Sequence, residues 1–401
     1  MRLSNSRVLK IIFLCILINS FVYQSFDPNG LLRIFIVALM WVSMVLLVYN
    51  FFKLFLKVKI SSYFRILFVF LMFWVGFLFF KSLKFDPEIL FTMFGHYYFG
   101  FGWFLPLAFV FGSDLNNFLN ALNLFKVFLI SGILFFCLYL LNIISASGLL
   151  NFFYVLPITL LVYPYIKYKK LLIVSLFILG WISVILSTRI NILLFVLIML
   201  CMLFIKFFKK DVKSKFIAFF VSFMILFCSI LSFNFTKSAL LSNKELTTDT
   251  RTFLITEMFN DFSNQDLILG RGVLGTYYSP YFKDWNNQGF DGGDSSTRSV
   301  NEIGYLHIIL KGGYILLLLH LLILIPAAYL GIKKSNNIIS KASGYYILIY
   351  LILSLLSYPP KYSIEFLILW FAVGITITRT SRLVKDEEIL IITTNNEKIY
   401  R

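Results

Sequence analysis

Four arginines in this chain are of the right type to bind an anionic group. Arg189 stands in a short turn between two long apolar runs, whereas Arg251, Arg271 and Arg298 lie in one long polar segment. A guanidinium group binds phosphate through two parallel hydrogen bonds and stays charged at any physiological pH. Each also has a simpler interpretation. Arg189 could snorkel to lipid headgroups, Arg271 stands between two glycines that could form an ordinary turn, and the other two could be solvated.

A carboxylate and a histidine lie where the polar segment returns to apolar sequence. They are Glu302 and His307. In a regular helix, Tyr305 would share the face of Glu302, whereas His307 and Lys311 would share a face turned by about 140°. A carboxylate at a membrane interface can have a raised pKa and act as a general base, or it can simply favour a helix start through the dipole. Gly312-Gly313 predicts a break in this helix.

Aromatic residues gather at two places. One is the run Phe94–Phe104, and the other is the cluster of Tyr277, Tyr278, Tyr281, Phe282 and Trp285 in the polar segment. Sugar rings stack on aromatic side chains, so either group could contribute to a glycan site. For the first run an aromatic belt at the membrane interface is the simpler interpretation.

The elements that must position these residues are membrane helices. The sequence is 60% hydrophobic and only 14% charged, whereas a soluble domain carries about 25% charged residues. Its net charge of +17 comes from short groups of lysine and arginine between apolar runs, which indicates the positive-inside rule and not nucleic-acid binding. The four cysteines and three histidines are too scattered for a disulfide framework or a metal site. We therefore expect no metal and no cofactor.

The fold class expected from these patterns is all-α: a polytopic membrane protein with about 12 transmembrane helices and one large periplasmic loop. Residues 1–22 resemble a signal peptide, but no cleavage site with small residues follows, so we expect an uncleaved first span. The distribution of cations places both termini in the cytoplasm. The predicted spans are 8–23, 31–52, 64–80, 88–111, 127–147, 150–166, 171–187, 190–207, 216–234, 304–331, 344–358 and 362–378.

These spans divide the chain into four parts. Residues 1–234 hold about nine helices, 235–303 form the periplasmic loop, 304–378 hold about three helices, and 379–401 form a cytoplasmic tail. The loop is too long for an ordinary connection, and loops of this length are usually functional or disordered. It is not of low complexity, because residues 251–262 have apolar side chains at helical spacing. We expect it to fold onto the outer face of the membrane.

In three features the chain resembles the O-antigen and capsular polysaccharide polymerases, the Wzy-like branch of the O-antigen ligase superfamily. The first is the layout, with many spans followed by a large outer loop and a few last spans. The second is Ser187-Thr188-Arg189 between two late spans, and the third is the segment Asn301–Gly313 at the loop exit. The ligases typically carry His-Asn or His-Ser where this chain has Asn301-Glu302, which favours a polymerase.

The resemblance implies a metal-independent glycosyltransferase in the bacterial inner membrane. It would transfer a growing glycan from undecaprenyl diphosphate to a lipid-linked repeat unit at the outer face. Glu302, or alternatively His307, would be the catalytic base. The diphosphate would be bound by the four arginines, Arg189, Arg251, Arg271 and Arg298. The glycan would contact Tyr277, Tyr278, Trp285 and Tyr305. The expected partners are undecaprenyl-diphosphate-linked glycan, membrane lipids and a chain-length regulator protein, without nucleic acid.

Two other functions remain open at this point. An O-antigen ligase would move finished glycan onto another acceptor. A lipid-linked oligosaccharide transporter (flippase) would usually have internal repeats and polar residues at the membrane midplane. We detect no repeat, and the ionisable groups cluster near the outer interface instead.

Overall fold

The computed structural model describes residues 4–26, 30–83, 85–185, 189–207, 252–280 and 296–389. Five of its helices are long and apolar enough to cross a membrane, which indicates a multi-pass membrane protein. They are α1 (Asn5–Phe26), α2 (Gly30–Phe55), α3 (Ser62–Ser82), α6 (Leu115–Leu140) and α15 (Gly304–Lys333).

Shorter helices complete the bundle, and the single span predicted at 150–166 is divided among the first three of them. They are α7 (Ala146–Phe153), α8 (Leu156–Leu161), the 3-10 turn η2 (Tyr163–Tyr165), α9 (Lys169–Ile185), α10 (Arg189–Phe207), α16 (Ile338–Leu353) and α17 (Ile364–Ile377). The short α18 (Arg379–Leu383) follows α17. The span predicted at 216–234 lies outside the described residues.

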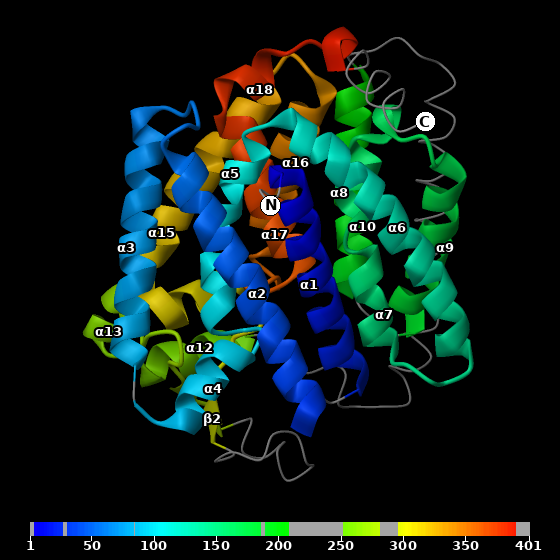
Figure 1. Cartoon of the computed structure of the whole chain (residues 1–401). Coiled ribbons are helices and arrows are strands. Elements are labelled where there is room, and N and C mark those ends of the chain that lie inside the picture. Colours follow the sequence, from blue (N-terminus) through cyan, green and yellow to red (C-terminus); the bar gives the residue numbers. More distant parts are fainter. Residues whose placement is uncertain are drawn as a thin grey trace.

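The helices run between two ends of one bundle (Figure 1). One end, here called the loop end, carries α4, α12, α13 and the strands, and the other carries α18. Helix α17 occupies the centre, with every one of its residues buried against α16, α15, α5 and η1. By contrast, α2 and α3 leave large apolar side chains exposed, such as Leu31 at 85% and Phe80 at 81%. A stripe of this kind suits contact with lipid tails and not with water.

The span predicted at 88–111 is wrong as a single helix. It is divided into α4 (Pro87–Gly95), the 3-10 helix η1 (Gly100–Ala108) and α5 (Phe109–Gly112). Close packing explains the division, because a Cβ on Gly102 would lie 3.0 Å from the backbone of Lys361 and Tyr362. Pro106 also has no amide proton to donate within a helix.

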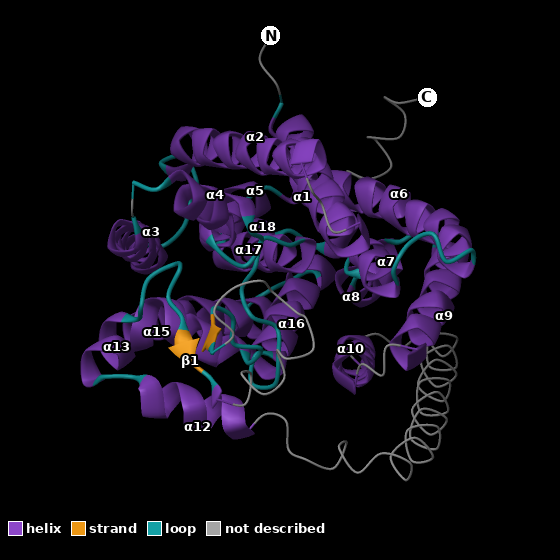
Figure 2. Ribbon diagram, turned by 90° about the horizontal axis from the view of Figure 1, so that it is seen from below, coloured by secondary structure: helices purple, strands orange, loops and turns teal. Residues whose placement is uncertain are grey.

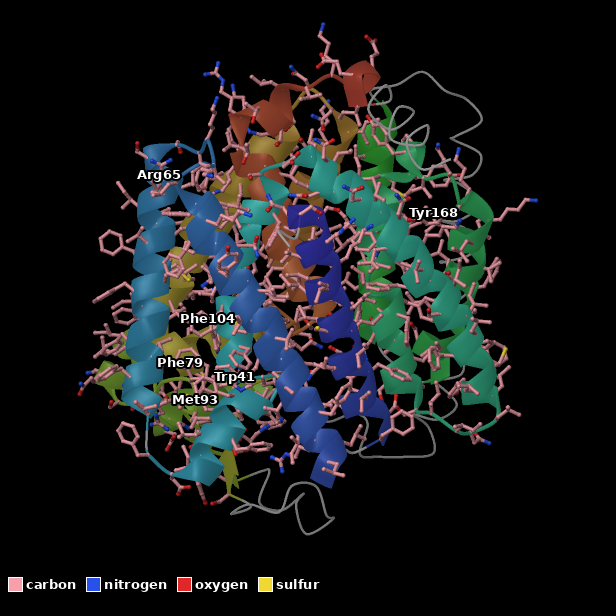
Figure 3. All side chains as sticks on the ribbon, in the orientation of Figure 1. Trp41, Arg65, Phe79, Met93, Phe104 and Tyr168 are labelled. Carbon is pink, nitrogen blue, oxygen red and sulfur yellow. The ribbon has the colours of Figure 1, made fainter. Side chains whose placement is uncertain are left out.

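This divided segment is packed inside the protein. Figure 3 shows Trp41 of α2, Phe79 of α3, Met93 of α4 and Phe104 of η1 gathered between α2 and α3. The ring centroids of Phe79 and Phe104 are 5.0 Å apart, and Met93 is fully buried. Phe101 and Trp103 are 2% and 1% exposed, so this part of the aromatic run lies in the protein core and does not form a belt facing lipid.

The described residues of the segment 235–303 fold against the start of α15. It forms α12 (Thr252–Asp261), α13 (Asn264–Leu269) and a two-stranded antiparallel ladder of β1 (Tyr277–Tyr278) and β2 (Thr297–Arg298). Figure 2 shows α12, α13 and the ladder grouped beside α15. A capping box, in which Ser263 and Asp266 bond each other's backbone amides, begins α13. We call this group of elements the lid.

Candidate functional site

The lid is hydrogen-bonded to α15 at a break in that helix. Gly313 has φ +66° and ψ −172°, which are not helical values, and this confirms the break predicted at Gly312-Gly313. The three carbonyls of residues 310–312 therefore need donors from elsewhere. They accept hydrogen bonds of 2.9 Å from the amides of Arg271 and Gly272 and from Nε1 of Trp74. The lid is thus bonded directly into the interrupted helix.

The side chain of Arg271 holds the lid together. Its guanidinium group pairs with Asp261 and with Asp266 (3.1 Å), and it donates to the carbonyl oxygens of Thr276 (2.8 Å) and Asp261 (2.6 Å). It also lies 4.5 Å from the ring centroid of Phe262. With two carboxylates already bound, Arg271 has the contacts of a structural residue and not those of an open phosphate site.

The pKa of Asp266 reflects this network. Burial by itself would raise the pKa of the carboxyl group, but hydrogen bonds from Arg271 and Ser263 outweigh that effect and place the pKa below its ordinary value. The ionised form of Asp266 therefore stabilises the lid.

Glu302 and Arg298 form an ion pair at the exposed edge of the lid. The distance from Nη2 to Oε1 is 3.0 Å, and the two side chains are 12% and 58% exposed. Glu302 precedes α15, so it is not on the helix face that the sequence predicted for it. Its carboxylate is accessible from outside the protein, as a general base requires.

A buried tyrosine lies beneath this pair. Tyr277 is opposite Arg298 in the strand ladder and is 1% exposed. Burial raises its pKa to about 12, and among the described residues its hydroxyl group has no hydrogen-bond partner. The neighbouring Tyr278 is 45% exposed, so the ladder presents one tyrosine inward and one outward.

His307 is fully buried at the first turn of α15. Its Nδ1 accepts a hydrogen bond of 3.3 Å from the backbone amide of Asn301, and its ring stacks on Trp103 with centroids 5.9 Å apart. Nε2 has no hydrogen-bond partner among the described residues. His307 therefore anchors the loop exit to the core and is not accessible to a substrate in this conformation. The face predicted for His307 relative to Glu302 does not apply, because Glu302 precedes α15.

The other residues predicted from the sequence have different positions. Tyr305 donates from its hydroxyl group to the carbonyl of Leu351 (2.7 Å), which ties α15 to α16. Arg189 begins α10, and its side chain is outside what the structure describes. Arg251 and Trp285 also lie outside the described residues.

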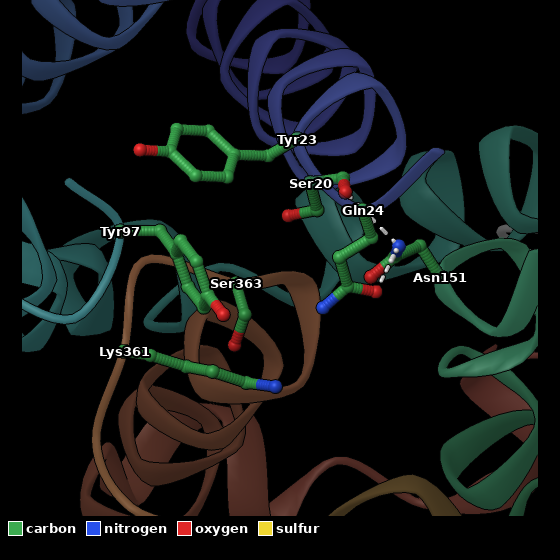
Figure 4. Close-up of a pocket in the computed structure, with 7 residues that line it drawn as sticks. All are labelled: Ser20, Tyr23, Gln24, Tyr97, Asn151, Lys361 and Ser363. Atoms are coloured by element: carbon green, nitrogen blue, oxygen red, sulfur yellow. Dashed lines mark hydrogen bonds between the residues drawn. The ribbon is translucent and has the colours of Figure 1, made fainter. Parts of the chain in front are cut away.

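A polar cavity lies at the loop end between α1, α7 and α17 (Figure 4). It has room for about one water molecule. Its lining consists entirely of residues with polar side-chain groups: Ser20, Tyr23, Gln24, Tyr97, Asn151, Lys361 and Ser363. We call it the Lys361 pocket.

An ion pair and an amide network organise the Lys361 pocket. Nζ of Lys361 is 3.0 Å from Oε1 of Glu365, and these side chains are only 16% and 8% exposed. Across the pocket, Nδ2 of Asn151 donates to Oε1 of Gln24 (2.9 Å) and to the carbonyl of Ser20 (3.2 Å). These contacts hold α1 and α7 together through polar groups within apolar surroundings.

The pocket lies at the start of α17, which is a short helix. Its 14 residues measure about 21 Å at 1.5 Å per residue, against a hydrocarbon core of about 30 Å. Irregular backbone at residues 357–363 leads to its first turn, and Tyr358 there has a positive φ of 63°. Such backbone is tolerated at membrane depth only where protein or a water-filled cavity surrounds it.

Two adjacent tyrosines lie between the pocket and the first turn of α15. Tyr97 lines the pocket, and its carbonyl accepts a hydrogen bond of 2.6 Å from the amide of Tyr362. The ring of Tyr98 has its centroid 6.1 Å from that of His307. The residues between α4 and η1 therefore contact the pocket through Tyr97 and α15 through Tyr98.

Lys361 was not among the residues identified from the sequence. One signal was present: Lys361 and Glu365 are four residues apart, the spacing of an ion pair on one helix face. Among the described residues, no group of three or more His, Cys, Asp or Glu side chains could hold a metal ion. The chain matches no protein-family model, no curated protein and no solved structure. The site is therefore interpreted from its own geometry.

Proposed function

We propose that this chain is a glycosyltransferase of the cytoplasmic membrane that joins lipid-linked oligosaccharide units into an O-antigen or capsular polysaccharide. In this proposal the loop end faces outward, both termini are cytoplasmic, and about twelve helices span the bilayer. The observation that carries the proposal is the accessible Glu302 carboxylate at the edge of a lid that is bonded into a broken membrane helix.

The reaction requires a base and a stabilised leaving group. The acceptor hydroxyl loses its proton to Glu302 and attacks the anomeric carbon of the donor glycan, whose bond to the lipid diphosphate breaks. The diphosphate leaves as an anion, and a fixed guanidinium group stabilises the charge that develops on it. Arg271 binds two lid carboxylates, whereas Arg298 lies beside the proposed base Glu302, so Arg298 is the first candidate for this role. Arg189 remains the second candidate, on the basis of its place at the start of α10.

A transporter for lipid-linked oligosaccharide is the second candidate function. Two interrupted helical segments support it. One is the divided segment of α4, η1 and α5, and the other is the broken helix α15. Interrupted helices often form the substrate sites of transporters. The lid is evidence against a transporter. It is hydrogen-bonded to α15 at the loop end of the bundle, and such a fixed cover suits a reaction at that end better than alternating access.

Deletion of the gene in its own bacterium distinguishes the candidates. For a polymerase, the cell envelope glycan should shrink from a ladder to single attached repeat units. For a ligase, no repeat unit should be attached, although lipid-linked polymer should accumulate. For a transporter, unattached single units should accumulate on the cytoplasmic face. Either of the last two results would reject the proposed polymerase.

A further inference from the structure

One carbonyl of α15 has lost its helical donor to a proline. Pro326 lies inside α15 and has no amide proton, so the carbonyl of Leu322, four residues earlier, cannot accept the usual helical bond. The hydroxyl group of Tyr63 on α3 donates to that carbonyl at 2.8 Å. Within a bilayer a carbonyl without a donor is costly, and a neighbouring helix commonly supplies one. Tyr63 therefore completes α15 at its proline.

The same face of α3 completes the other interruption of α15. Nε1 of Trp74 bonds the carbonyl of Gly312 at 2.9 Å, directly before the non-helical Gly313. Trp74 follows Tyr63 by eleven residues, which is about three helical turns and places both side chains on one face. Figure 2 shows α3 at the edge of the bundle beside α15. A helix that exposes large apolar side chains, such as Phe73 at 72%, thus directs a hydrogen-bond donor to each interruption.

The end of α3 lies against residues 270–275 of the lid. Oγ of Ser82 accepts a hydrogen bond of 3.2 Å from the amide of Leu274. Gly272 has a φ of +86°, and a Cβ there would lie 2.3 Å from the same oxygen, so only glycine allows this close approach. The same segment bonds α15 through two of its backbone amides. The lid is therefore held by α3 as well as by α15.

Each of the two helices also contributes a lysine to this segment. Nζ of Lys81 on α3 donates to the carbonyl of Gly270. Lys311 on α15 is fully buried, and its Nζ donates to the carbonyl of Gly275 at 2.9 Å. A hydrogen bond from a charged donor is stronger than one between neutral groups. The first and last residues of the segment are thus held by ammonium groups, one from each helix.

We infer that α3 is a brace that fixes the lid against α15 and so positions the Arg298–Glu302 pair. This pair spans the junction of the two parts, because Arg298 lies in strand β2 of the lid and Glu302 directly precedes the N-cap of α15. A lid that shifts on α15 therefore changes the distance between the two side chains. Trp74, Lys81 and Ser82 act as positioning residues, and the reaction that they serve rests on the proposed function.

Hydrogen exchange of the lid tests the brace without any need for turnover. The full chain is purified into lipid nanodiscs, and exchange is measured in residues 264–275. Ser82→Ala and Trp74→Phe each remove one hydrogen bond made by α3, so exchange there should become about two- to tenfold faster.

The matched control variants lie on α9. Ser175→Ala removes a buried hydroxyl group that has no hydrogen-bond partner among the described residues. Trp181→Phe changes a side chain that is 60% exposed. Both controls should leave exchange in the lid at its original rate.

The distance between the lid and α15 gives an independent measurement. Spin labels are attached at Ile255 of α12 and Leu318 of α15, which are 40% and 57% exposed, in a chain without other cysteines. The distance distribution from double electron–electron resonance should broaden or shift in Lys81→Met. Lys81→Arg keeps a charged donor at this position and should retain the original distribution.

Each outcome supports or rejects the brace. Faster exchange confined to the lid, with thermal unfolding of the whole chain unchanged, supports it. Equal exchange in the α3 and control variants, or an increase spread evenly over all helices, rejects it. If the lid shifts in the α3 variants but gene deletion leaves the glycan chain length unchanged, the brace stands and the proposed function fails. If gene deletion shortens the glycan but the α3 variants leave the lid in place, only the brace fails.

Discussion

Two ion pairs at the loop end have the same spacing and length but lie in different surroundings. Arg298–Glu302 and Lys361–Glu365 each join residues four apart at 3.0 Å. The first carboxylate is 58% exposed, whereas the second is 8% exposed. An exposed pair contributes about 0–1 kcal/mol, but removing one partner of a buried pair costs about 3–5 kcal/mol. The carboxylate of the lid pair is therefore accessible, and the pocket pair is part of the structure.

The largest expected effect follows from breaking the buried pair. Lys361→Met leaves Glu365 as an unpaired buried carboxylate, and the free energy of unfolding should fall by about 3–5 kcal/mol. The double variant Lys361→Met, Glu365→Gln removes both charges and should recover most of that loss. Denaturant titration in detergent, followed by circular dichroism, measures both. If the single variant were as stable as the double variant, an unpaired Glu365 would not be costly, which would contradict its burial.

A smaller effect is expected where the lid enters α15. Gly313 has a positive φ, and a Cβ there would lie 2.1 Å from the carbonyl oxygen of Ile268. Gly313→Ala should therefore destabilise the lid by about 1–3 kcal/mol and speed hydrogen exchange in residues 264–275. Gly76→Ala on α3 is the matched control, because no atom lies within 4 Å of its added Cβ. Equal exchange in both variants would mean that the lid does not depend on the break.

Of the three sites substituted, the Arg298–Glu302 pair should have the smallest effect on the free energy of unfolding. Arg298→Met leaves a carboxylate that is 58% exposed, so it should lower the free energy of unfolding by less than Lys361→Met does. The same variant should shorten the glycan chains if Arg298 stabilises the leaving diphosphate. Stability comes from denaturant titration and chain length from gel electrophoresis of the envelope glycan. A loss of stability as large as that of Lys361→Met would remove the contrast between the pairs.

The pH dependence of the lid should follow Asp266. Its pKa is lowered below the ordinary value of 3.8, so its stabilising contribution is complete above that value and is lost as pH falls through the folded pKa. Limited proteolysis of residues 264–275 should accordingly increase on acidification below about pH 4. Asp266→Asn should be cut faster at neutral pH and should lose this dependence. A profile unchanged by the substitution would assign the effect to another group.

The sequence predicted the parts of this fold that depend on local pattern. Long apolar runs correspond to α1, α2, α3, α6, α9, α10 and α15, and the adjacent glycines predicted the break at Gly313. Pro106 interrupts the run at 88–111, but the way in which the segment divides could not be predicted, because its conformation depends on packing against α17. Lys361 was missed for the same reason. Its spacing to Glu365 resembles that of surface pairs, and its burial comes from neighbouring helices distant in the sequence.

The candidate site was only partly predictable. Glu302 and His307 could be identified at the loop exit, but their different surroundings could not, because Glu302 precedes α15. The roles of Arg271 and Arg298 could not be separated, because one side chain meets two lid carboxylates and the other meets Glu302. Those partners are brought together only by the folded lid.

Glu302→Gln tests the proposed chemistry most directly. The substitution keeps the shape of the side chain and removes its capacity to accept a proton, and at 58% exposure it should leave the stability nearly unchanged. Expressed at normal level in a strain that lacks the original gene, Glu302→Gln should give single repeat units and no ladder, as the deletion does. A normal ladder of chain lengths would contradict the assignment of Glu302 as the base.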